Sequence, residues 1–184
     1  MTLSDSFSPG DTESAPGGQL AHPMNIAHLK QLEKRLYQVG EKAYCYVGNG
    51  LSNQSFVEGP EGLIAIDTGE SVEEMEAALK AVRKVTKAPV VACFYSHFHY
   101  VSGTQALLDE SNVMEIPIYG HAGIPGNIAR FGGEVAPRVS RGLVHQFGLK
   151  LPNEGKDGLV HAGLGRFFRN PDHAPFTQGY IPPN

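Results

Sequence analysis

The sequence has few cysteines, and they follow no metal-binding or redox pattern. Cys45 and Cys93 are the two cysteines among 184 residues. They have neither zinc-finger spacing nor the C-x-x-C arrangement. Both lie within apolar, strand-like stretches, which favours buried free thiols and a reducing compartment.

Long apolar runs and basic clusters are also missing. No run approaches the roughly 18 apolar residues of a membrane span, and the first thirty residues lack the charged and apolar regions of a signal peptide. The net charge is −4, and the chain has no polybasic stretch. We therefore expect a cytoplasmic protein that binds neither nucleic acid nor membrane.

The length suits one domain with tails, and 22 glycines and 13 prolines indicate abundant loops. Residues 1–24 are rich in Ser, Gly, Pro and acidic residues, which predicts a flexible arm or one ordered by a partner. Residues 126–184 predict an irregular, partner-docking extension with a short helix near 138–147. This extension has 7 basic against 4 acidic residues. Its histidines are expected at the surface or at an interface: His145, His161 and His173.

Residues 25–125 alternate between strand and helix patterns. Ser71-Val72-Glu73-Glu74 is a capping box, followed by apolar residues at helical spacing, so the clearest predicted helix begins there. A continuous apolar run just before it, 63–67, predicts a strand buried on both faces. The other expected elements are a short helix at 25–33, a hairpin at 35–47, a strand at 55–58, a strand at 89–94, a helix at 104–110 and a strand at 116–119. The pattern is that of an α/β fold.

Two histidines follow the strand at 89–94. His97 and His99 stand where a strand gives way to a loop and then a helix, the usual place for a ligand site in layered α/β folds. An i, i+2 pair on extended backbone points both imidazoles to the same side, so the two can share one metal ion. The alternative is a pair of hydrogen-bonded loop histidines.

These pieces together resemble the metallo-β-lactamase superfamily and, within it, the alkylsulfatase-like branch. The resemblance rests on Leu63-Ile64-Ala65-Ile66-Asp67-Thr68-Gly69, on the capped helix and on Tyr95-Ser96-His97-Phe98-His99. It extends through Gly163-Leu164-Gly165 to Gly179-Tyr180-Ile181-Pro182-Pro183, and so covers roughly 35–184. It implies the N-terminal half of an αββα sandwich followed by a long irregular tail.

The family motif, His-x-His-x-Asp-His, is incomplete here. His97 and His99 match the ligands of one zinc, but the Asp position is Val101 and the second His position is Ser102. Val101 cannot coordinate a metal, and a serine hydroxyl is a poor zinc ligand. The resemblance therefore implies one zinc ion, held by His97 and His99 and shared with a partner chain. Imidazole also suits manganese or iron.

Three further residues are candidates for orienting the metal-bearing loop or contacting substrate: Asp67, Tyr100 and Ser102. The alternatives are an aspartate that caps a turn and a tyrosine that packs in the crevice wall. A half sandwich also leaves one sheet face uncovered, so a second polypeptide is expected to cover it and supply the missing ligands.

The first hypothesis is a subunit of a split, hetero-oligomeric hydrolase, inactive alone. With its partner it would cleave a sulfate ester, another ester or an activated aryl alkyl ether in a small molecule. The alternative is a non-catalytic, degenerate subunit that stabilises or regulates a catalytic partner. A third hypothesis, a truncated product that does not fold, predicts insoluble protein.

Overall fold

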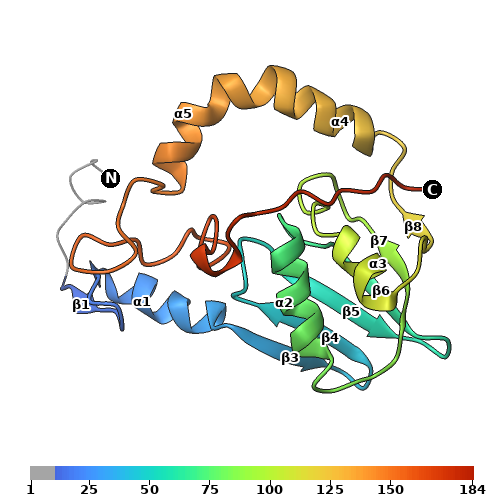
Figure 1. Cartoon of the computed structure of the whole chain (residues 1–184). Coiled ribbons are helices and arrows are strands. Elements are labelled where there is room, and N and C mark those ends of the chain that lie inside the picture. The colour runs from blue at the N-terminus through green and yellow to red at the C-terminus, as the bar shows by residue number, and fades with distance from the viewer. Residues whose placement is uncertain (1–10) are drawn as a thin grey trace.

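The fold is built around one mixed six-stranded sheet (Figure 1). The computed structural model describes residues 11–184. The strands lie in sequence order and are antiparallel as far as the fourth, after which two parallel pairings follow. They are β3 (Arg35–Val39), β4 (Ala43–Val47), β5 (Gln54–Glu58), β6 (Leu63–Ile66), β7 (Val90–Phe94) and β8 (Ile118–Tyr119). The predicted α/β class and the predicted hairpin at 35–47 are confirmed.

Two helices, α2 (Val72–Val82) and α3 (Gln105–Ser111), cover one face of this sheet (Figure 1). The capping box forms at the start of α2, where the Ser71 hydroxyl accepts a hydrogen bond from the Glu74 amide at 3.2 Å. The apolar stripe of α2 packs into a core with side chains from the strands and α3, all almost fully buried. Among them are Phe56, Leu63, Met75 and Leu107.

The opposite face of the sheet is apolar, and residues 11–184 leave it uncovered. Val57 pairs with Ile64, and Phe94 pairs with Tyr119. These four side chains are 40%, 39%, 49% and 55% exposed. The uncovered face therefore carries large apolar side chains on four adjacent strands.

The extension after residue 123 is more helical than the sequence predicts. It contains α4 (Ile124–Arg130), the π-helix η3 (Phe131–Val135) and α5 (Ala136–Gln146), which together arch away from the sheet (Figure 1). The prediction of an irregular segment at 126–137 is wrong. Gly132 and Gly133, which indicate a loop in the sequence, lie inside the π-helix. Beyond Gly148 the tail is irregular as predicted, with one short 3-10 helix, η4 (Pro171–His173).

The N-terminal arm is ordered by the chain itself over its described part. It contains β1 (Glu13–Ser14), β2 (Leu20–Ala21), α1 (Pro23–Leu29) and the 3-10 helix η2 (Lys30–Leu32). Gln19 is 7% exposed, and its amide donates to the carbonyl of Asn153 at 2.6 Å. The expectation of a flexible or partner-ordered arm is therefore wrong for 11–24, and for 1–10 it lies outside the described residues. The division into three parts at 24 and 125 stays a prediction.

Both cysteines are free thiols, Cys93 fully buried and Cys45 partly so. Within residues 11–184, none of the helices has the length and apolar character needed to cross a membrane.

Candidate metal centre

The two histidines lie at the carboxyl ends of β6 and β7, which run parallel. The loops after these strands are held side by side by two backbone hydrogen bonds. The amide of Thr68 donates to the carbonyl of Tyr100 at 2.8 Å, and the amide of Ser102 donates to the carbonyl of Gly69 at 3.0 Å. This is the edge at which ligand sites form in layered sheets.

His97 and His99 lie close together and are exposed. Their ring centroids are 5.2 Å apart, with an interplanar angle of 66°. The pKa of His99 is lowered, first by partial burial and second by the nearby His97. Both effects favour neutral imidazole, the form that binds a metal.

A hydrogen-bonded chain from Asp67 fixes the ring of His97. The Ser96 hydroxyl donates to one carboxylate oxygen of Asp67 at 2.5 Å, and the Ser96 amide donates to the other at 2.9 Å. The same hydroxyl lies 2.8 Å from Nδ1 of His97. The Ser96 hydroxyl has a single hydrogen, which it donates to Asp67, so its bond with His97 is one in which Nδ1–H donates and the hydroxyl oxygen accepts. The lone pair of Nε2 is then left free for a metal ion.

Asp67 reaches Ser96 because its backbone is in the left-handed region, at φ 55°. Aspartate tolerates this region better than most residues do. The bend ends β6 and turns the carboxylate toward the neighbouring strand, where the amide of Asp67 also bonds the carbonyl of Phe94 at 2.9 Å. The predicted role of Asp67 in orienting the histidine loop is consistent with this geometry.

Aromatic rings surround the two imidazoles. Phe98 lies 3.9 Å from the ring of His99, and Phe131 meets His99 edge-on at 5.6 Å and 87°. Tyr100 meets His97 edge-on at 5.0 Å and 89°. Phe131 is the first residue of the π-helix η3, a feature that often marks functional sites.

The two positions that carry second-site metal ligands in the family motif, Val101 and Ser102, stabilise the fold here. Val101 is 2% exposed, packs into the main core and forms an isolated bridge with Gly69. Ser102 bonds through its backbone, accepting at its carbonyl from the Gly179 amide at 2.7 Å. A Cβ atom at Gly103 would stand 2.1 Å from the Thr68 carbonyl and 2.6 Å from Cβ of Met75 on α2. The loop is therefore tied to the core at the point where the family motif continues.

Two carboxyl groups lie behind the histidine loop. Burial raises the pKa of Glu74 to about 7. Hydrogen bonds from the Glu70 backbone, Gln54 and Ser52 lower this pKa, but by less. Burial also raises the pKa of Glu70 to about 7. The nearby Glu74 carboxylate raises this pKa further, and the Arg169 cation lowers it. Glu74 is 4% exposed, and its Oε1 accepts from the Gln54 amide at 2.7 Å. Near pH 7 these groups are poised between the neutral and charged forms.

The described residues supply only half of a zinc site. Within residues 11–184 no group of three or more His, Cys, Asp or Glu side chains is placed to hold a metal. Catalytic zinc normally has three protein ligands. The two imidazoles of His97 and His99 are suitable zinc ligands, but a zinc site would need at least one further protein ligand.

The structure brings most, but not all, of the residues predicted for this site together. Asp67, Tyr100 and both histidines meet at one edge, whereas no hydrogen bond joins the Ser102 hydroxyl to either imidazole among the described residues. Sequence reasoning missed Ser96 and Phe131. One feature of the sequence could have indicated Ser96: it lies between the end of a strand and a histidine, where a hydroxyl can form hydrogen bonds on both sides. Phe131 had none, because it lies in a segment without a clear pattern.

Comparisons with known proteins identify relatives of the chain, although no family model matches it. A linear primary-alkylsulfatase of Pseudomonas sp. (strain ATCC 19151) is 36% identical over 113 residues, which are 59% of this chain and 21% of that protein. The stereoselective inverting sec-alkylsulfatase Pisa1 of Pseudomonas sp. superposes with a TM-score of 0.73 at 25% identity. The match covers 88% of this chain and 26% of that one.

The chain is homologous to part of the alkylsulfatases, the branch of the metallo-β-lactamase superfamily that its sequence resembles. An (R)-specific secondary-alkylsulfatase of Pseudomonas sp. is 29% identical over 145 residues, 76% of this chain. The alkylsulfatase-like chain spans about a fifth of the length of the curated relatives it matches.

Proposed function

We propose that this alkylsulfatase-like chain is the part of a metal-dependent hydrolase that carries two of its metal ligands. Its partner polypeptide supplies the remaining ligands, and together they cleave a small sulfate ester, a related ester or an activated aryl alkyl ether. The proposed metal is one zinc ion held by His97 and His99. The alkylsulfatase relatives support the hydrolase class and the sulfate-ester preference.

One observation carries the proposal, the chain of hydrogen bonds from Asp67 through Ser96 to His97. It fixes the tautomer that leaves Nε2 open, which is the arrangement expected around a metal-binding imidazole. A pair of structural loop histidines has no need of a carboxylate and hydroxyl that hold one ring nitrogen and leave the other free.

The residues around the imidazoles have separate tasks in this proposal. Zinc, when bound, would lower the pKa of a coordinated water to about 7. Asp67 and Ser96 hold the ring of His97, while Phe98 and Phe131 shield one side of His99 from water. Tyr100, edge-on to His97, is placed for substrate contact at the same edge.

The uncovered sheet face supports a partner that completes the sandwich. Val57, Ile64, Phe94 and Tyr119 expose large apolar side chains on the face away from α2 and α3. Burial of apolar area stabilises by about 25 cal/mol per Å², so a second sheet packed here would be held strongly. β6 and β7, whose ends carry the site, contribute to this face, so a partner sheet would bring its own loops near the histidines.

The test is to measure zinc content and alkyl sulfate hydrolysis of the full chain, alone and with the neighbouring gene product. We expect one zinc per pair and hydrolysis only with the partner, both lost in His97→Ala. The matched control is His121→Ala, at an exposed histidine whose Nδ1 accepts from the Gly123 amide outside the site. Undiminished zinc and activity in His97→Ala would refute the proposal.

A second candidate function is a non-catalytic subunit that keeps the fold and stabilises a catalytic partner. The burial of Val101 at 2% exposure favours it, because the Asp position of the motif has become part of the core. In that case the partner alone hydrolyses the ester, and His97→Ala changes neither rate nor metal content.

A further inference from the structure

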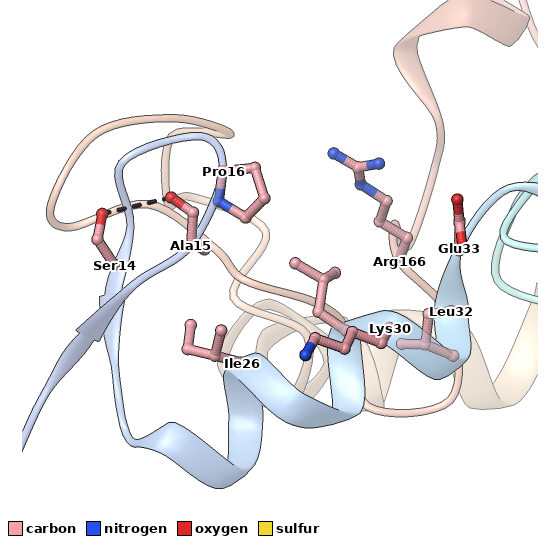
Figure 2. A pocket seen from close by; sticks show the side chains of 9 residues that line it. Ser14, Ala15, Pro16, Ile26, Lys30, Leu32, Glu33 and Arg166 are labelled. Atoms are coloured by element: carbon pink, nitrogen blue, oxygen red, sulfur yellow. Dashed lines mark hydrogen bonds between the residues drawn. The ribbon is translucent and has the colours of Figure 1, made fainter.

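A cavity of about 520 Å³ lies between the N-terminal arm, the α1–η2 helices and the tail (Figure 2). Ile26, Leu29 and Leu32 form its helical floor, and Pro16 faces them across the cavity. Figure 2 shows Lys30 on the floor and Arg166 entering from the tail. No residue of the histidine loop lines this cavity, so it is separate from the candidate metal centre.

The walls of the cavity are tied together by hydrogen bonds between segments far apart in sequence. The Leu20 amide donates to the Lys156 carbonyl at 3.1 Å, and the Gly155 amide donates to the Gly17 carbonyl at 2.9 Å. Nε2 of His28, on α1, lies 2.9 Å from the Gly163 carbonyl. Three separate contacts thus hold the arm and the tail around the cavity, which reduces the ordering cost of binding a ligand.

The backbone beneath Arg166 is also fixed. Gly165 is buried, and a Cβ atom there would stand 2.6 Å from the Leu51 carbonyl, so only glycine permits this approach. The Gly165 carbonyl accepts from the Ala162 amide at 2.8 Å. The Arg166 guanidinium lies 5.2 Å from the centroid of the Phe167 ring. The tail therefore presents this cation from a defined position.

Three charged side chains line the cavity. Lys30, Glu33 and Arg166 line it, and none of them is in an ion pair within residues 11–184. Two cations against one carboxylate leave a single positive charge. An apolar interior with a few charged groups at its edge is typical of ligand sites of this volume.

We propose that this cavity binds an amphiphilic monoanion, an aliphatic chain that ends in a single sulfate or carboxylate group. The aliphatic chain lies along Ile26, Leu29 and Leu32, and the head group meets Arg166, while Lys30 adds positive charge on the floor. Arginine suits both head groups because its guanidinium donates two parallel hydrogen bonds to them. Glu33 disfavours a ligand with a second negative charge.

The test is calorimetric titration of the full chain with decanoate and with decyl sulfate, each below its micelle concentration and with a metal chelator present. We expect one ligand per chain, and up to about fourfold tighter binding for each added methylene in the series from octanoate. Arg166→Gln should weaken both anions about tenfold or more. The relative affinity of the two anions identifies the preferred head group.

Controls separate this site from surface adsorption. Arg138→Gln, at an exposed arginine on α5, should bind as wild type, and Ile26→Ser should flatten the dependence on chain length. Decanol, which has no charge, and decanedioate, which has two, should both bind more weakly than decanoate. Unchanged affinity in Arg166→Gln, or decanol as tight as decanoate, overturns the proposal. Circular dichroism of each variant confirms that the comparison is made on folded protein.

Discussion

The sheet with its two helices, residues 35–119, and the tail, residues 120–184, are held in place by different kinds of contact. The first region is stabilised by side chains with almost no exposed area, such as Phe56 and Leu107. The tail has few buried apolar side chains and is fastened by individual hydrogen bonds. One joins the Asn170 amide to the Asn49 carbonyl at 2.9 Å, and another joins the Tyr95 hydroxyl to the Ile181 carbonyl at 2.8 Å. Substitutions in the first region should therefore affect the whole fold, and those in the second should act locally.

The largest effect is expected in the shared core. Phe56→Ala removes a fully buried ring between β4, β6 and α2 and should lower the free energy of unfolding by about 3–5 kcal/mol. Leu164→Ala in the tail, where the side chain is 56% exposed, should change it by less than about 0.5 kcal/mol. Urea denaturation of the full chain measures both. Equal losses would mean that the tail is part of the same core.

A pH-dependent effect is expected behind the histidine loop. Burial raises the pKa of Glu74 from 4.5 to about 7, so the folded state holds a proton that the unfolded state has released between these values. The contribution of Glu74 to stability is therefore complete below about pH 4.5 and is lost as the pH rises through 7. Relative to wild type, Glu74→Gln should gain about 2 kcal/mol in unfolding free energy between pH 5 and pH 8.

The control for this experiment is Glu76→Gln, at an exposed position on the same helix. The comparison with wild type separates Glu74 from distant groups such as His173, whose pKa is lowered by burial and then by Lys34, against Asp172 and Glu73. Glu70 is coupled to Glu74, so the measured difference belongs to the pair. A difference between Glu74→Gln and wild type that stays constant from pH 5 to pH 8 would show that the carboxyl does not titrate in this range.

A smaller effect is expected where the tail meets the sheet. Tyr95→Phe leaves the Ile181 carbonyl without its donor and removes the hydroxyl that lies 2.5 Å from Oγ1 of Thr104. The cost should be about 1–2 kcal/mol, with faster hydrogen exchange in the last residues of the tail than in α2. Tyr119→Phe, at a side chain that is 55% exposed, is the matched control. Uniformly faster exchange across the sheet would contradict a local role.

The same contrast explains what could be predicted from the sequence. The strands and α2 were predictable because their apolar periodicity and the Ser71 cap are local properties that the core reinforces. His173 was expected at the surface or an interface, yet it is 3% exposed. Its burial depends on how the tail folds back, and no nearby residue signals this. The helices at 124–146 were obscured by the glycines of the π-helix.

The candidate site follows the same rule. His97, His99 and Asp67 were predictable because a strand end and a short motif mark them. Ser96 completes the hydrogen-bonded chain only because β6 and β7 lie side by side, which a single segment does not reveal. Phe131 reaches His99 from a helix more than thirty residues further along the chain, so it depends wholly on tertiary structure.

The central claim is that His97 and His99 form one half of a metal site, with Nε2 of His97 left open by Ser96 and Asp67. The most direct test is a zinc titration of the full chain followed by nitrogen-15 NMR of its eight labelled imidazoles. We predict that the resonances of His97 and His99 shift together as one zinc binds, and that free His97 carries its proton on Nδ1. Movement of other histidines in their place, or a proton on Nε2 of free His97, would contradict this account.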